Sequence, residues 1–173
     1  MNIKKDVVCI GGGIMSVTLA RLLQELDPDL DITIYEKLSS CALESSQSIN
    51  NAGTGHAGFC ELNYTPMNRQ QLVSVDRALK INSEFEVSLQ FWSFLTKKYK
   101  SFKPESFITQ VPHISLVKGD KNISFLKKRY EVLSKTLLFK GMQFSRSKET
   151  IKEWAPLIAE DLKDNIAMTR VKY

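Results

Sequence analysis

Three consecutive glycines, Gly11 to Gly13, are the first residues of this sequence whose spacing can do chemistry. They separate an apolar run, "VVCI", from a segment with helical periodicity. Written as G-x-G-x-x-G, the motif is Gly11-x-Gly13-x-x-Ser16, with a small serine in the third glycine slot. The first glycine permits a tight turn, the second lets the backbone approach a pyrophosphate, and a small third residue lets the helix pack on the strand. The motif therefore predicts a phosphate-binding turn at the start of a helix.

Glu36 is the second candidate for chemistry, because it stands twenty positions after Ser16, at the end of the next apolar run. A carboxylate at this place accepts hydrogen bonds from the hydroxyl groups of an adenosine ribose. It also repels a 2′-phosphate, which argues against NADP. The alternative is a glycine-rich turn beside a solvated glutamate.

Apolar periodicity indicates the elements that must position these residues. A run rich in β-branched residues predicts a buried parallel strand over 6–10, and a second strand is expected over 31–35. The helix between them starts at Ile14 and ends at Asp27-Pro28, because the residue before proline disfavours helical backbone. This βαβ unit predicts an α/β fold of the Rossmann type. A long helix is expected over 68–98, either continuous or restarted by a capping box of Ser83 and Glu86. The elements expected after it are a strand over 111–119, a helix over 122–138, a short helix ended by Pro156, and a strand near the last residues.

The segment 37–66 is a long loop rich in Ser, Asn, Gly and Thr. Loops of this length are uncommon in compact domains unless they are functional. Amide, hydroxyl and imidazole groups in it are able to wrap a pyrophosphate and reach an isoalloxazine ring, which favours FAD over NAD. The alternative is an ordinary loop of Asx turns. The groups in question belong to Asn50, Asn51, Gly53, Thr54, Gly55 and His56.

Charge is unevenly distributed along the chain. Residues 1–60 hold four Lys/Arg against seven Asp/Glu, whereas residues 61–173 hold twenty against twelve. The basic part suits anionic lipid, nucleic acid or an anionic substrate, or is a solvated lysine-rich surface. The run Lys127-Lys128-Arg129 is expected to be solvated on its helix. Three scattered cysteines and two histidines predict no metal site, and no apolar run reaches the roughly 18–20 residues that span a bilayer.

The sequence resembles the malate:quinone oxidoreductases, FAD-dependent enzymes with a flavoprotein fold of the D-amino-acid-oxidase type. The stretches that carry the resemblance include "CIGGGIMSVTLARLLQELDPDLDITIYEK", "NNAGTGHAGFCELNYTP", "VPHISLVKGDKNISFLKKRYEVL" and "IKEWAPLI", and they extend over essentially the whole chain. The resemblance implies oxidation of (S)-malate to oxaloacetate, a tricarboxylic acid cycle step, with electrons passed through FAD to membrane quinone. It implies a peripheral enzyme at the cytoplasmic face of the membrane. Nucleic acid is not an expected partner.

The resemblance also implies roles for individual residues. Gly11, Gly13 and Ser16 would form the pyrophosphate turn, and Glu36 would bind the ribose. His56 and His113 are the candidate catalytic residues, although either histidine is open to a purely structural role, and Arg170 is a candidate for binding a carboxylate. The residues expected along the flavin are Ser45, Ser46, Asn51, Gly53, Thr54 and His56.

The expected organisation is an N-terminal part of an FAD-binding domain over 1–80, then a helical segment and the start of a substrate-binding domain over 81–173. Members of the family are longer, so the chain is expected to be truncated and to expose apolar surface. Two alternatives stay open. One is another FAD-dependent dehydrogenase of 2-hydroxy or 2-amino acids, and the other is a truncated, non-catalytic FAD-binding remnant.

Overall fold

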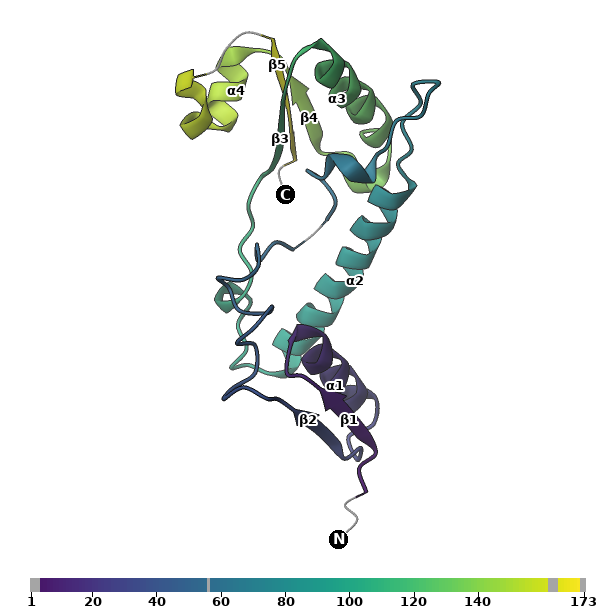
Figure 1. The fold of residues 1–173 in the computed structure, drawn as a ribbon, viewed down its shortest axis with the longest axis vertical. Coiled ribbons are helices and arrows are strands. Elements are labelled where there is room, and N and C mark those ends of the chain that lie inside the picture. The colour runs from purple at the N-terminus through teal and green to yellow at the C-terminus, as the bar shows by residue number, and fades with distance from the viewer. Residues whose placement is uncertain (1–3, 56, 162–164, 172–173) are drawn as a thin grey trace. The chain divides into compact units, whose positions relative to one another are not determined.

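The computed structural model describes residues 4–55, 57–161 and 165–171, and it divides the chain into two compact units, 1–54 and 55–173. Figure 1 shows a parallel sheet in the N-terminal unit and an antiparallel sheet in the C-terminal unit. The expected mixture of helices and strands is therefore confirmed at the level of a mixed α and β fold.

The N-terminal unit is the predicted strand–helix–strand unit. Strands β1 (Val7–Ile10) and β2 (Ile32–Tyr35) pair in parallel, and helix α1 (Ile14–Leu26) connects them. The helix ends where expected, because Asp27 before Pro28 has an extended backbone, with φ −142° and ψ 100°.

Much of the apolar surface of this unit is exposed. Helix α1 has no buried residue, and Ile10, Met15 and Leu26 are each about 80% exposed. Two strands and one helix form too small a layer to bury these side chains. The expectation of exposed apolar surface is confirmed.

The C-terminal unit combines a long helix with a three-stranded antiparallel sheet. Helix α2 (Asp76–Lys98) precedes strand β3 (His113–Lys118) and helix α3 (Asp120–Leu133). The sheet order is β3-β5-β4, with β4 at Met142–Ser145 and β5 at Ile166–Val171. Helix α4 (Lys148–Trp154) packs on one face of the sheet and α3 on the other, as Figure 1 shows. Short 3₁₀ turns lie at Leu62–Tyr64, Pro104–Ser106, Leu137–Phe139 and Pro156–Asp161.

Two expectations about helix limits were wrong. The helix expected from residue 68 begins at Asp76, because Asn68 closes a local turn instead. The Asn68 side-chain oxygen accepts from the Leu72 N–H at 2.9 Å, and the Asn68 N–H donates to the Leu72 carbonyl at 2.9 Å. Such local bonds compete with helix formation. The helix expected over 122–138 ends at Leu133, and the backbone continues into the 3₁₀ turn at Leu137–Phe139.

Helix α2 is continuous through Ser83, so the capping-box alternative is excluded. The Ser83 hydroxyl donates to the Leu79 carbonyl at 2.8 Å, one turn earlier, as in a helix interior.

Within the part of the chain that the structure describes, no helix is long and apolar enough to cross a membrane. Strand β4 was not predicted.

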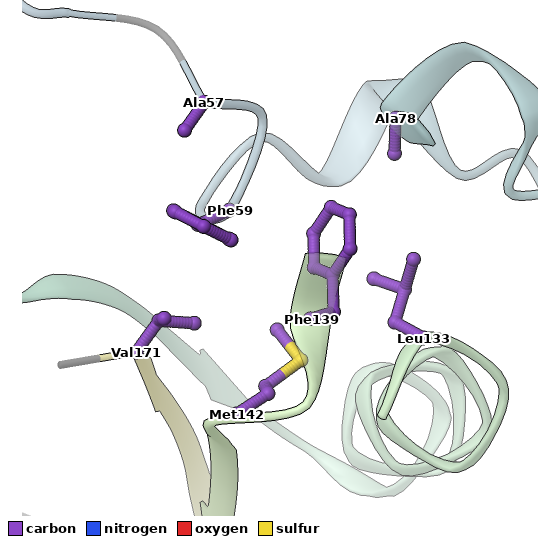
Figure 2. Close-up of a cluster of buried hydrophobic side chains, with 7 residues drawn as sticks. All are labelled: Ala57, Phe59, Ala78, Leu133, Phe139, Met142 and Val171. Atoms are coloured by element: carbon purple, nitrogen blue, oxygen red, sulfur yellow. The ribbon is translucent and has the colours of Figure 1, made fainter. Parts of the chain in front are cut away.

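The main core of the C-terminal unit joins Ala57 and Phe59, from the last part of the 37–66 loop, to α2, α3 and the sheet (Figure 2). Phe59 and Phe139 meet edge to face, with ring centroids 5.1 Å apart at 79°. This geometry is favourable beyond simple area burial. The cluster consists of Ala57, Phe59, Ala78, Leu133, Phe139, Met142 and Val171.

Replacing Phe139 by alanine is expected to destabilise the protein by about 3–5 kcal/mol, because a fully buried ring is lost and a cavity remains. The matched control is Leu137→Ala in the same 3₁₀ turn, where the side chain is 86% exposed. The control should change stability by less than about 0.5 kcal/mol. Urea unfolding followed by circular dichroism measures both, and equal effects would contradict this packing.

Candidate nucleotide-binding site

A pocket of about 350 Å³ lies in the N-terminal unit, between the glycine turn, the end of β2 and the loop that follows. Five predicted site residues line it: Gly11, Gly13, Glu36, Ser45 and Ser46. The structure thus brings together residues that are up to 35 positions apart in the sequence. The other lining residues are Ile10, Tyr35, Lys37, Ala42, Leu43 and Glu44.

The glycine turn needs glycine at two positions for different reasons. Gly11 has a φ of +88°, which L side chains rarely adopt, and its N–H donates to the Tyr35 carbonyl at 2.7 Å. Gly12 is buried, and a Cβ there would lie 2.6 Å from Cys41 Sγ and 3.2 Å from Glu36 Oε2. Gly12 was treated as a variable position of the motif, and only the folded loop shows why it is glycine.

Glu36 is held against the turn by backbone N–H groups. Its Oε1 accepts from Leu38 at 3.0 Å and its Oε2 accepts from Gly12 at 2.6 Å. Bonds from these two N–H groups, that of Leu38 first, hold the pKa of the Glu36 carboxyl below its ordinary value. A carboxylate has about four acceptor sites, so the Glu36 side chain can accept further hydrogen bonds from the hydroxyl groups of a ligand in the pocket.

The start of α1 forms another side of the pocket. Ser46 Oγ accepts from the Ile14 N–H at 2.9 Å, and the first turn of α1 contains no acidic residue. Among the described residues, the N–H groups of Gly13, Met15 and Ser16 have no protein acceptor. Unpaired N–H groups at a helix start favour an anion, above all a phosphate. The pocket therefore combines backbone N–H groups that suit an anion with a carboxylate that retains acceptor capacity.

The other predicted cofactor-binding residues are not among the residues that line this pocket. Ser16 lies in the first turn of α1 and is half-buried. Asn51 is engaged in the loop itself, because its amide donates to the Gln47 carbonyl at 2.8 Å and its oxygen accepts from the Gly53 N–H at 2.7 Å. This is the Asx-type turn that the alternative interpretation of the loop expected. Thr54 is exposed, and His56 lies outside the described residues.

His113 and Arg170 are the predicted candidates in the C-terminal unit, and they lie on opposite faces of the sheet. Arg170 pairs with Ile114, the neighbour of His113 on β3, and successive side chains of a strand alternate between faces. His113 is half-buried, with Nδ1 3.8 Å from Cys60 Sγ and its ring 5.4 Å from that of Phe59. The Arg170 guanidinium lies 5.9 Å over the Trp154 ring. A small ligand on one face contacts only one of the two.

The prediction that Arg129 is solvated together with Lys127 and Lys128 was wrong, because the Arg129 side chain is fully buried. Burial lowers the pKa of the guanidinium to about 10. Lys127 is exposed, as expected.

The structure is that of a mixed α and β protein whose N-terminal pocket is lined by a glycine-rich turn and a carboxylate. The family model for malate:quinone oxidoreductase matches residues 3–173, and the chain belongs to this family of oxidoreductases. The resemblance stated from the sequence is thereby confirmed.

Curated relatives agree with this membership. Probable malate:quinone oxidoreductases from Bacillus cereus strain AH187 and Bacillus thuringiensis strain Al Hakam are each 49% identical over 172 residues, and one from Bacillus mycoides strain KBAB4 is 48% identical. Each match covers 99% of this chain and 34% of the relative. The chain therefore spans about a third of the length of these relatives.

Gly12→Ala is expected to weaken ADP binding about tenfold or more, because the new methyl group displaces Cys41 and Glu36 from the turn. Isothermal titration calorimetry with ADP measures the affinity. The double variant Gly12→Ala/Cys41→Gly removes the closer obstruction and should recover part of the loss. Unchanged affinity in the single variant would contradict the role of Gly12.

Proposed function

We propose that this protein oxidises (S)-malate to oxaloacetate, with FAD as the hydride acceptor and membrane quinone as the final electron acceptor. This is a step of the tricarboxylic acid cycle. Membership of the malate:quinone oxidoreductase family over residues 3–173 is the observation that carries the proposal.

FAD is the proposed cofactor, and the N-terminal pocket fits its ADP half. The glycine turn and the start of α1 would hold the pyrophosphate, and Glu36 would accept from the ribose hydroxyls. Ser46 supplies a hydroxyl at the same helix start. When bound, FAD supplies the two-electron acceptor that malate oxidation requires. Residues proposed to lie along the flavin are Ser45, Ser46, Asn51, Gly53, Thr54 and His56.

Malate oxidation requires that the substrate hydroxyl lose a proton as the hydride leaves the same carbon. His113 is our proposed residue for contact with this hydroxyl or a neighbouring carboxylate, since its imidazole is half-buried and held by Cys60 and Phe59. His56 is the second proposed catalytic residue.

We propose that residues 1–80 are part of an FAD-binding domain and that residues 81–173 begin a substrate-binding domain. The boundary between these two regions falls inside α2, whereas the two compact units of the structure divide between Thr54 and Gly55. The proposed boundary separates regions by the ligand that they bind, not by compactness. Residues 61–173, with twenty Lys/Arg against twelve Asp/Glu, suit peripheral contact with the anionic cytoplasmic face of the membrane.

Glu36→Gln is expected to weaken FAD binding about tenfold or more, because a charged acceptor of the ribose hydroxyls becomes neutral. Quenching of flavin fluorescence on titration with the protein measures the affinity. Glu44→Gln is the matched control, since Glu44 also lines the pocket but is exposed and paired with Lys37 at 3.7 Å. Equal losses in the two variants would argue against a specific role of Glu36.

In a protein of the relatives' full length that includes these 173 residues, malate is expected to bleach the flavin absorbance under anaerobic conditions, whereas lactate and amino acids are not. His113→Asn should lower kcat/KM for malate at least about tenfold with FAD content unchanged. Bleaching by lactate at the malate rate would favour a different 2-hydroxy acid. A flavin-loaded protein that no acid reduces would favour a non-catalytic remnant.

A further inference from the structure

Four successive carbonyl groups, those of residues 57–60, accept hydrogen bonds from side chains of three different elements. Asn82 of α2 donates to the Ala57 carbonyl at 2.9 Å. Arg129 Nη2 of α3 donates to the carbonyl of Phe59 at 2.7 Å and to that of Gly58 at 3.4 Å. The Ser115 hydroxyl of β3 donates to the Cys60 carbonyl at 2.8 Å. We call this set of donors, Asn82, Ser115 and Arg129, the carbonyl clamp.

The clamp is enclosed in the protein. Asn82 and Arg129 are 1% and 0% exposed, and Ser115 is 7% exposed. Arg129 Nε also donates to Thr65 Oγ1 at 3.0 Å, and the Thr65 hydroxyl donates to the Leu62 carbonyl at 3.0 Å. One guanidinium therefore fixes both ends of the 58–65 segment to α3.

Arg129 has no carboxylate partner among the described residues. A buried charge is costly to desolvate, and even a paired one contributes little net stability compared with apolar packing. Its stabilising contacts are hydrogen bonds to backbone carbonyls and one hydroxyl, so its specific effect is on the position of the 58–65 segment. An apolar side chain of the same volume could fill the space but could not fix these carbonyls.

The clamped segment ends at the thiol that contacts His113. Ser115 and His113 are two positions apart on β3, so they share one face of the sheet. The bond from Ser115 to the Cys60 carbonyl thus sets the distance between the segment and this strand. Cys60 Sγ lies 3.8 Å from His113 Nδ1, and the Phe59 ring packs on the imidazole edge to face.

We propose that Arg129, with Asn82 and Ser115, is a positioning residue that fixes the backbone of residues 57–60 and thereby orients the His113 imidazole through Cys60 and Phe59. The role of His113 toward malate rests on the proposed function, whereas the clamp itself does not. Cys60 acts here as a neutral hydrogen-bonding partner, since burial raises the pKa of its thiol.

The clamp is tested by the reactivity of the Cys60 thiol toward DTNB in the 173-residue chain, with labelled cysteines assigned by mass spectrometry. Arg129→Met removes the donors at similar volume, so the Cys60 rate should rise about tenfold or more through local opening. Amide exchange over residues 57–60 should accelerate as well. The exposed Cys41 is the internal control, and its rate should not change.

Lys127→Met is the matched variant on α3, because Lys127 is exposed and 3.9 Å from Glu131. It should leave the Cys60 rate unchanged. Circular dichroism and the thermal midpoint show whether each variant is folded. Should Arg129→Met not fold, Ser115→Ala and Arg129→Lys decide the question, since each removes only part of the clamp. Cys60 rates equal to wild type in all folded clamp variants would overturn the proposal.

In the same protein of the relatives' full length, Arg129→Lys and Ser115→Ala should each lower kcat for malate at least about fivefold with FAD content unchanged, and Arg129→Met should lower it more than Arg129→Lys. A purely structural clamp would change the thermal midpoint and the Cys60 rate but leave kcat unchanged, and this result would overturn the positioning role. A wild-type protein without malate activity would refute the proposed function, while the thiol rates would still decide the clamp.

Discussion

The hydrogen bond from the Gly12 N–H to Glu36 Oε2, 2.6 Å long, is the contact on which the N-terminal site depends. It fastens the end of β2 to the turn that follows β1, next to the backbone bond from Gly11 to the Tyr35 carbonyl. A Cβ at Gly12 would lie 3.2 Å from Glu36 Oε2 and 2.6 Å from Cys41 Sγ, so glycine lets both side chains stay close to the turn. One carboxylate therefore shapes the glycine turn and retains acceptor capacity in the pocket. The same hydrogen bond therefore determines the shape of the turn and the position of the Glu36 carboxylate in the pocket.

The two units meet the cost of burying polar groups in different ways. The N-terminal unit keeps its polar site near solvent and exposes apolar side chains of α1. The C-terminal unit encloses the Arg129 guanidinium, where every neutralising contact must come from carbonyl dipoles and a hydroxyl. The buried charge in the second unit thus fixes a backbone segment, whereas the unpaired backbone N–H groups at the start of α1 in the first unit suit an anion.

The strand–helix–strand unit could be predicted from local sequence pattern, and the predicted limits of both strands agree with the structure within one residue. The signals used were runs of β-branched residues and the proline that ends the helix, and both depend only on residues close in the sequence. The joint presence of Gly11, Gly13 and Glu36 in one pocket followed from the same motif. The burial of Arg129 could not be predicted, since it depends on carbonyls about seventy positions away, and a run of three basic residues is usually solvated. The four-residue strand β4 is too short for its pattern to be distinctive.

We propose above that the glycine turn and Glu36 bind the ADP half of FAD. The most direct measurement is competition between nucleotides for the folded 173-residue chain, with FAD fluorescence as the signal. We expect ADP to displace FAD, and FMN, which lacks the adenosine part, not to displace it. Displacement by FMN but not by ADP, or no binding of FAD to chain shown to be folded by circular dichroism, would contradict it.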